Sequence, residues 1–259
     1  MTEPTAKMPE INLAKAELKV VDELVSHFVN NRHQFERIVG ELNAAFTASP
    51  ALKPLVHSLK WRIKDPTHLR DKLIRKWVVA KQKHRAFHIT RANLFQKIND
   101  LVGFRVLHLY TREMERLNSA LIQSLSEGYK LKEGPSARTW DDESRQYFEG
   151  IGITTEPSDT MYTSVHYVFE TRSVTKFTCE VQVRTLAEEL WGEVDHDINY
   201  PSPVGVVACS EQIKVLARLT SACSRLVDSI YKSMEVAPDR AVSALKARAK
   251  VVPRRNASR

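Results

Sequence analysis

The chain has 259 residues, of which 42% are hydrophobic, 8% aromatic and 27% charged. This length suits one large domain with appendages, and the composition excludes a wholly disordered chain. No apolar run approaches the roughly 18 residues of a membrane span, and three cysteines are too few for a disulfide scaffold. We therefore expect a soluble protein of the reducing cytoplasm.

The positive charge is concentrated at one end of the chain. Thirty-nine lysines and arginines face 31 aspartates and glutamates, and the last 20 residues hold seven of the basic residues and no acid. Such a tail is typical of a solvated, frayed terminus. It would equally serve as an electrostatic arm for nucleic acid, without sequence selectivity.

The first predicted element is a long amphipathic helix over residues 11–47, where apolar side chains from Leu13 to Phe46 recur at spacings of three, four and seven. A short extended piece follows. Asp65-Pro66 then predicts the start of a second helix, with Asp65 as its cap and Pro66 in its first turn. This helix is rich in lysine and arginine.

The hydrophobic period then alternates between that of a strand and that of a helix. Runs rich in β-branched and aromatic residues predict strands over Gly103–Tyr110, Thr163–Thr171 and Lys176–Thr185. Helical periods cover Arg112–Ser126, Leu186–Tyr200 and Ser210–Met234. The polar, acidic stretch Gly134–Thr160 predicts an exposed loop or lid.

These elements predict an α/β fold, with a mixed β-sheet flanked by helices. We expect an N-terminal helical extension over residues 1–50, a sheet-bearing domain over 51–203, a C-terminal helix over 204–238 and a basic, disordered tail over 239–259. The terminal helices are consistent with core cover, with self-association or with binding of an antitoxin-like partner.

The most informative segment is the strand Cys179–Thr185. With a side-chain period of two, Glu180, Gln182 and Arg184 share one face while two valines point to the other. A carboxylate there can hold a divalent metal or accept a proton, and the arginine can stabilise phosphate charge. An edge strand with a polar, solvent-facing stripe would give the same pattern.

Two further groups of residues stand at the starts of strands. Asp100 comes just before Gly103, which permits close approach to the backbone. Tyr162, at a loop-to-strand junction, can stack on a base, and His166 can meet a phosphate or ribose. Each group also has an ordinary structural explanation, as a surface acid in a turn or as buried core side chains.

Taken in order, these segments resemble the synthetase domain of the RelA/SpoT family, the alarmone pyrophosphokinases. The resemblance runs from about Leu52 to Tyr200, a little over half of the chain. The motifs that carry it are R-x-K at Arg62 and Lys64, D-x-x-G-x-R at Asp100–Arg105, Y-x-S-x-H at Tyr162–His166, E-x-Q-x-R-T at Glu180–Thr185, and W-x-x-x-D-H-x-x-x-Y at Trp191–Tyr200.

The resemblance implies a nucleotidyltransferase-like synthetase fold that transfers the β,γ-pyrophosphate of ATP to the ribose 3′-hydroxyl of GDP or GTP. It implies that Asp100 and Glu180 hold Mg²⁺ and that Glu180 takes the proton of the attacking hydroxyl. It implies further roles at matching positions: Arg62 and Arg105 around the adenine; Lys64, Lys72 and Arg75 at the phosphates; Tyr162 on the guanine; His166 and Gln182 beside the acceptor.

The acceptor loop departs from the family pattern G-Y-R/Q-S-x-H. Met161 replaces the glycine and Thr163 replaces the arginine or glutamine, while Asp195 stands where many members have glutamate. Two alternatives therefore stay open: a relative that pyrophosphorylates the 3′-CCA end of tRNA or an adenine nucleotide, with the basic tail attracting tRNA, and a non-catalytic nucleotide-binding module. The presence of both Asp100 and Glu180 disfavours the second.

Overall fold

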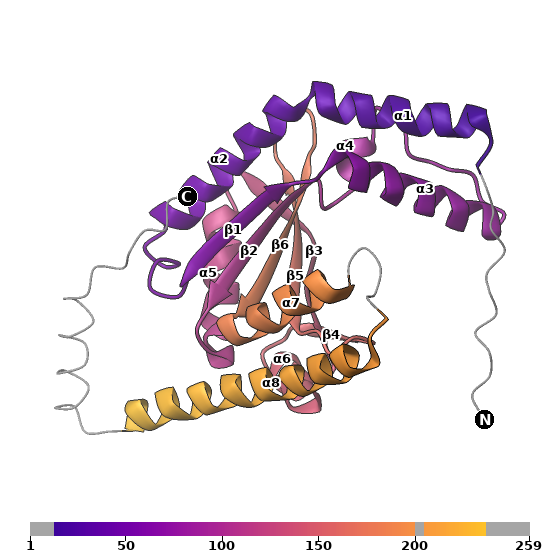
Figure 1. The fold of residues 1–259 in the computed structure, drawn as a ribbon. Coiled ribbons are helices and arrows are strands. Elements are labelled where there is room, and N and C mark those ends of the chain that lie inside the picture. Colours follow the sequence, from indigo (N-terminus) through magenta and orange to yellow (C-terminus); the bar gives the residue numbers. More distant parts are fainter. Residues whose placement is uncertain (1–12, 200–204, 237–259) are drawn as a thin grey trace.

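The computed structural model describes residues 13–199 and 205–236, in which helices surround a six-stranded mixed sheet (Figure 1). The strands are β1 (Ser58–Ile63), β2 (Val102–His108), β3 (Tyr129–Thr139), β4 (Thr154–Pro157), β5 (Ser164–Thr171) and β6 (Thr178–Thr185). The helices are α1 (Lys15–Asn30), α2 (Arg32–Ala48), α3 (Pro66–Gln82), α4 (Leu94–Lys97), α5 (Met114–Leu125), α6 (Asp142–Gly150), α7 (Leu186–Asn199) and α8 (Val207–Val236), with a 3₁₀ turn, η1 (Thr111–Glu113). The predicted fold class, a mixed sheet flanked by helices, is confirmed.

The strands lie in the order β1-β2-β6-β5-β3-β4. The pairs β2–β6 and β3–β4 are parallel, and the other three pairs are antiparallel. β6 therefore lies inside the sheet, between β2 and β5, so its polar residues do not form the stripe of an edge strand. In Figure 1, α7 lies in front of the strands and α5 behind them.

The strand register aligns polar residues across the sheet. Lys60 on β1 pairs with Arg105 on β2, Arg105 pairs with Gln182 on β6, and Gln182 pairs with His166 on β5. A neighbouring row joins Gly103 to Glu180. Because paired residues point to the same face of a sheet, these side chains gather on one side of it.

The prediction of a single helix over residues 11–47 is wrong, because the chain turns at Asn31. There α1 ends and α2 begins, with Asn31 at φ −104° and ψ 13°. The Asn31 amide donates to the carbonyl of His27 (2.8 Å) and its oxygen accepts from Gln34 (2.7 Å), so the side chain competes with the helical hydrogen bonds. Apolar residues of both helices, including Phe28 and Phe35, join the main core.

The predicted start of α3 is confirmed. Asp65 is the N-cap, and its Oδ1 accepts hydrogen bonds from the backbone N–H groups of Thr67 (2.8 Å) and His68 (3.3 Å). Pro66 occupies the first helical position, where a missing N–H costs nothing. Leu69 and Leu73 anchor the helix in the core, and Arg75 and Lys76 on its other side are exposed.

The prediction of an exposed loop over Gly134–Thr160 is also wrong, because the segment holds the second half of β3, together with α6 and β4. The turn-like Gly134-Pro135 lies inside β3, where the register against β5 shifts. Gly134 has φ +88°, and a Cβ there would collide with the carbonyl oxygen of His166. Glycine thus accommodates a bulge in a continuous strand.

A second, smaller apolar cluster lies between α7 and α8. Trp191 packs with Ile213 and Ala217 there, and Met161 and Tyr162 of the predicted acceptor loop contact the same cluster. Among the described residues, every helix is too short or too polar to cross a bilayer. The basic tail predicted over 239–259 lies outside the described residues, as does Tyr200.

Candidate nucleotide site

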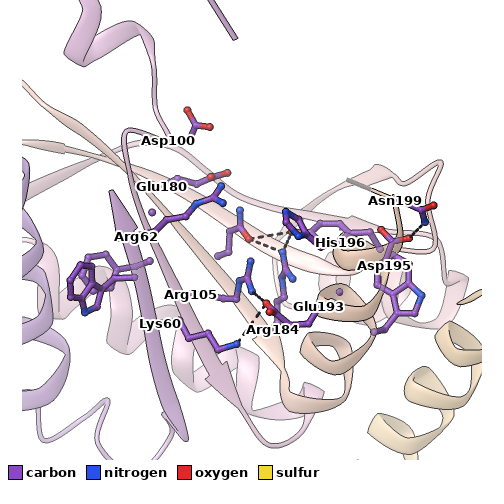
Figure 2. Close-up of a pocket in the computed structure, with 17 residues that line it drawn as sticks. Lys60, Arg62, Asp100, Arg105, Glu180, Arg184, Glu193, Asp195, His196 and Asn199 are labelled. Atoms are coloured by element: carbon purple, nitrogen blue, oxygen red, sulfur yellow. Dashed lines mark hydrogen bonds and ion pairs between the residues drawn. The ribbon is translucent and has the colours of Figure 1, made fainter. Parts of the chain in front are cut away.

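A cavity of about 540 Å³ opens between the polar face of the sheet and α7. Its sheet side carries residues of β1, β2 and β6, including Lys60, Arg62 and Arg105, and its other wall is the α7 segment from Trp191 to Asn199. In Figure 2, Asp100 and Glu180 lie at one end of the cavity, and Asp195 and Asn199 lie on the opposite side. The strand register described above is what brings these segments together.

Asp100 lies in the turn before β2 and is held by two lysines. Lys64 Nζ donates to its Oδ2 (2.8 Å) and Lys72 Nζ to its Oδ1 (2.7 Å). Burial by itself would raise the pKa of Asp100, but the two ammonium groups outweigh it, so the pKa lies below its usual value. Asp100 is therefore ionised at neutral pH, with its charge compensated by cations from β1's end and from α3.

Glu180 on β6 is the second carboxylate of the cavity. Its Oε1 lies 3.1 Å from Nδ1 of His166. Burial and the negative charge of Asp100 act to raise the pKa of Glu180, but the hydrogen bond and charge of His166 prevail and lower it. Asp100 and Glu180 also line a neighbouring hollow of about 440 Å³, so the carboxylate pair stands where two cavities meet.

A chain of hydrogen bonds leads from Glu180 across the sheet. Nε2 of His166 lies 3.1 Å from the hydroxyl of Tyr162, and Arg184 donates to that hydroxyl (2.6 Å) and to Oε1 of Gln182 (2.7 Å). The Arg184 guanidinium also lies over the Tyr162 ring, 4.6 Å from its centre. All five side chains are thus fixed relative to one another.

Arg184 is an internal cation in this structure, although the sequence pattern favoured a phosphate contact for it. Its side chain is only 6% exposed, and it forms an ion pair with Glu189 on α7 (3.4 Å). Its Nε is buried without a hydrogen-bond partner among the described residues. Gly192 makes room for it, since a Cβ there would lie 2.7 Å from its NH1 atom.

Glu189 joins α7 to three strands. Besides Arg184 on β6, it accepts from Lys60 on β1 (2.9 Å) and from Arg105 on β2 (2.7 Å). Burial would raise the pKa of Glu189, but these cations lower it. Glu193, one helical turn later, contacts the same Lys60 and Arg105 from the open side of the cavity.

The structure places ten of the eleven predicted site residues in contact with this cavity or with its carboxylates, and the exception is Arg75. Arg75 instead lines a separate groove along the exposed face of α3. Of the described residues that line this groove, only Lys72 also lines the hollow beside the two carboxylates. Arg62 lies against Gly103, whose missing side chain leaves room for it. Arg105 forms ion pairs with Glu189 and Glu193. These pairs outweigh the effect of burial and raise the pKa of the Arg105 guanidinium.

The places of Glu189, Glu193 and Lys60 in the cavity were not predicted from the sequence. A usable signal was present, since Glu189 and Glu193 are spaced i, i+4 and so share one face of the predicted helix. Which strands that face would meet follows from the packing of α7 against β2 and β6, and this packing is not visible in the sequence.

The donor set at the carboxylates suits Mg²⁺. Within the described part of the chain, no cluster of three or more His, Cys, Asp or Glu side chains forms a complete protein-only metal site. Mg²⁺ typically takes one or two carboxylates and leaves its other positions to phosphates and water. Two ionised carboxylates at one end of an open cavity match that preference.

Comparison with known proteins agrees with this geometry. A family model described as a region found in RelA / SpoT proteins matches residues 61–204, more than half of the chain. A search of curated proteins found no match.

Solved structures of small alarmone synthetase 1 from Bacillus subtilis share the fold. The first covers 83% of this chain and 98% of its own, with 16% identity and a TM-score of 0.57. The form bound to its product pppGpp covers 80% and 95% (17% identity, TM-score 0.54), and the form bound to AMPCPP covers 78% and 96% (15% identity, TM-score 0.54). The matched region and the shared architecture lead to one conclusion: this chain belongs to the RelA/SpoT family, whose members are nucleotide-binding transferases of the pyrophosphokinase kind.

Proposed function

We propose that the protein transfers the β,γ-pyrophosphate of ATP to the ribose 3′-hydroxyl of GDP or GTP. The observation that carries this proposal is the pair of ionised carboxylates, Asp100 and Glu180, at the junction of two cavities within a cationic surface. Family membership supports it. The fold neighbour that was solved with AMPCPP and with its product pppGpp supports a nucleotide donor and a nucleotide acceptor.

On the donor side, the cavity residues suit an adenine and its phosphates. Arg62 and Arg105 reach the cavity from adjacent strands, and flat guanidinium groups stack well on bases. The ammonium groups of Lys64 and Lys72 donate hydrogen bonds to Asp100. From this position beside the carboxylates they could donate to phosphate oxygens instead. Arg75, one turn beyond Lys72 on α3, extends this cationic surface.

Asp100 and Glu180 would hold Mg²⁺, which when bound neutralises charge on the transferred phosphates. The chain's own part is mainly alignment and charge compensation, as phosphoryl-type transfer requires. The hydroxyl oxygen bonds to the β-phosphorus, the bond from that phosphorus to the α–β bridging oxygen breaks, and AMP leaves. Glu180, ionised and hydrogen-bonded to His166, takes the hydroxyl proton.

On the acceptor side, the hydrogen-bonded group around His166 fixes the orientation of the nucleotide. Tyr162 offers a ring for stacking on guanine, and its hydroxyl is held by Arg184. Gln182 and His166, paired across β6 and β5, lie beside Glu180. Arg184 therefore acts on the acceptor through Tyr162 and Gln182.

The direct test incubates the purified chain with Mg²⁺, GDP and ATP labelled at the γ-phosphate. We expect label in a guanosine product, and we expect Glu180→Gln or Asp100→Asn to lower the rate by at least about a hundredfold, because each removes a carboxylate from the reaction centre. Glu127→Gln, a change of an exposed acid outside the site, is the matched control. Full activity of Glu180→Gln would refute the proposal.

A second candidate, the 3′-CCA end of tRNA or an adenine nucleotide as acceptor, is favoured by the loop before β5. Met161 packs into the apolar cluster with Trp191, and Thr163 is buried and bonded to Thr139 (3.0 Å). The loop is thus attached to α7 through Met161 and to β3 through Thr163, and both residues depart from the family pattern. Supplying deacylated tRNA and ATP or ADP in parallel with GDP distinguishes the two, since label on tRNA or adenosine alone would select this candidate.

A further inference from the structure

A groove of about 570 Å³ runs along the exposed side of α3, next to the site described above, and Lys72 lies at the border of the two. Its polar lining is basic throughout, and consists of Lys72, Arg75, Lys76, Lys83, Arg85 and His88. None of the described acidic side chains lines it. Among the described residues, Arg75, Lys76, Lys83 and Arg85 form no ion pair, so their charges face solvent uncompensated.

The end of α3 builds the second wall of this groove. His84 adopts φ +50°, its N–H donates to the carbonyl of Lys81 (3.0 Å), and the N–H of Arg85 donates to that of Ala80 (2.8 Å). These two bonds form a Schellman motif, which reverses the chain after a helix. The following residues run back beside α3, and Phe87 stacks on Trp77 with ring centres 4.1 Å apart.

The groove has an apolar floor beneath its basic rim. Val79, Phe87 and Ile89 line it, and Phe87 remains partly exposed. A basic groove with an aromatic ring in its floor is typical of sites for single-stranded nucleic acid, where cations follow the phosphates and bases stack on rings. A free polyphosphate would gain nothing from the apolar floor.

The groove carries more charge than one nucleotide requires. Lys64, Lys72 and Arg75 are already proposed to meet the donor phosphates, so Lys76, Lys83 and Arg85 are additional. From Lys72 to Lys83 the helix covers roughly 16 Å at 1.5 Å per residue. Phosphates of an unpaired, extended strand lie farther apart than the rise of a duplex, so that length spans only a few consecutive phosphates of a single strand.

We propose that the α3 groove binds a single-stranded RNA segment of a few nucleotides through its phosphates and at least one stacked base. The groove ends at Lys72, whose ammonium group contacts Asp100, so a bound strand would approach the carboxylate pair. This binding does not depend on the pyrophosphate transfer proposed above. Only the functional link between a bound strand and the carboxylate pair rests on that proposed function.

The test measures fluorescence anisotropy of a labelled 12-nucleotide RNA of A and U, titrated with the full chain at several salt concentrations. The groove variant combines Lys76→Gln, Lys83→Gln and Arg85→Gln. The control variant combines Arg116→Gln, Lys130→Gln and Lys232→Gln, three exposed cations that lie outside the groove and form no ion pair within the described residues. Both variants keep the basic tail, so its contribution is the same in each.

We expect the groove variant to weaken RNA binding roughly tenfold and to lower the slope of log Kd against log salt by about 2, as loss of three phosphate contacts predicts. The control variant should change the Kd less than twofold. Phe87→Leu, which keeps an apolar floor, should weaken RNA binding about threefold or more through lost stacking. Equal weakening by the two triple variants, or none by either, would overturn the proposal.

Competition with a 12-residue polyglutamate separates nucleic acid from an acidic protein partner. Displacement of the RNA by polyglutamate at equal charge concentration would overturn the assignment to nucleic acid, and failure to displace it supports the assignment. Pyrophosphate transfer from ATP to GDP, assayed without RNA, should be unchanged in the groove variant. Absence of transfer in the unmodified chain would refute the proposed function and leave the RNA result standing.

Discussion

At the scale of single residues, the site depends on how closely α7 approaches β6. The distance is set at Gly192, where no side chain separates the helix from the Arg184 guanidinium. Arg184 in turn donates to both Tyr162 and Gln182. A residue with no functional group of its own therefore controls the position of the groups proposed to orient the acceptor.

Gly192→Ala should lower the rate of pyrophosphate transfer by about ten- to a hundredfold. The new Cβ would lie 2.7 Å from NH1 of Arg184, so the guanidinium must shift and Tyr162 and Gln182 lose their common donor; small displacements in an active site have effects of this size. Initial rates with ATP and GDP measure it. Gly40→Ala is the control, because its Cβ has nothing within 4 Å, and wild-type activity of Gly192→Ala would contradict the argument.

His108 makes a prediction about stability and pH. It is buried at the end of β2, Nδ1 has no hydrogen-bond partner among the described residues, and burial lowers its pKa from 6.5 to about 4. The unfolded chain therefore binds this proton at a higher pH than the folded chain does. The free energy of unfolding is therefore not reduced by His108 above pH 6.5. It falls as the pH decreases from 6.5 to 4, by up to about 3 kcal/mol.

Urea unfolding of the wild type and of His108→Leu between pH 7 and pH 4 measures this difference. We expect the unfolding free energy of the wild type to fall by about 3 kcal/mol more than that of the variant. The comparison is necessary because Glu188, whose pKa burial raises to about 7, acts in the opposite direction in both proteins. His33→Gln, at an exposed position, should follow the wild type. Parallel curves for wild type and His108→Leu would contradict the prediction.

At the scale of elements, α3 ends with a residue that is poorly suited to its conformation. His84 occupies the left-handed position of the Schellman motif at φ +50°, where a side chain costs about 1 kcal/mol relative to glycine. His84→Gly should therefore raise the free energy of unfolding by roughly 0.5–1 kcal/mol in urea denaturation. The matched control is His88→Gly in the returning segment, where φ is not positive and glycine should destabilise.

The sequence predicted those elements that have a strong local signal. The N-cap at Asp65-Pro66 depends only on residues that are neighbours in the sequence. The alternation of polar and apolar side chains in Cys179–Thr185 requires only that a strand has two faces. The bend at Asn31 was missed because an asparagine can sit within a helix or end it, and the apolar period continues on both sides. Gly134-Pro135 has the composition of a turn, and only its pairing with His166 on β5 makes it a bulge.

The same distinction separates the site residues that the sequence identified from those that it did not. Glu180 and Asp100 stand at or beside strands whose motifs resemble a known family. Their nearness depends on the parallel pairing of β2 with β6, which places Gly103 opposite Glu180. Glu189 belongs to the site only because α7 folds back over β1, β2 and β6, a contact between elements that no local pattern encodes.

At the scale of the whole molecule, α7 contacts the sheet, the loop before β5 and α8. Its inner face holds cations of three strands through Glu189, and Trp191 packs against Ile213 of α8 and donates to its carbonyl (3.1 Å). The loop carrying Met161 contacts the same cluster. The sheet, the acceptor loop and α8 are thus all attached to α7. Among these contacts, the ion pairs of the buried Glu189 carboxylate depend most strongly on charge.

Glu189→Gln should destabilise the protein by roughly 3 kcal/mol, because it leaves the buried guanidinium of Arg184 without its carboxylate partner and removes the inner partner of Arg105. Glu193→Gln is the matched control: both glutamates contact Lys60 and Arg105, but the Glu189 side chain is 7% exposed and that of Glu193 is 53% exposed. Solvent screens the ion pairs of Glu193, so their loss should lower the free energy of unfolding by less than about 1 kcal/mol. Urea denaturation of both variants measures the contrast, and equal losses would mean that α7 is held to the sheet by packing and not by this carboxylate.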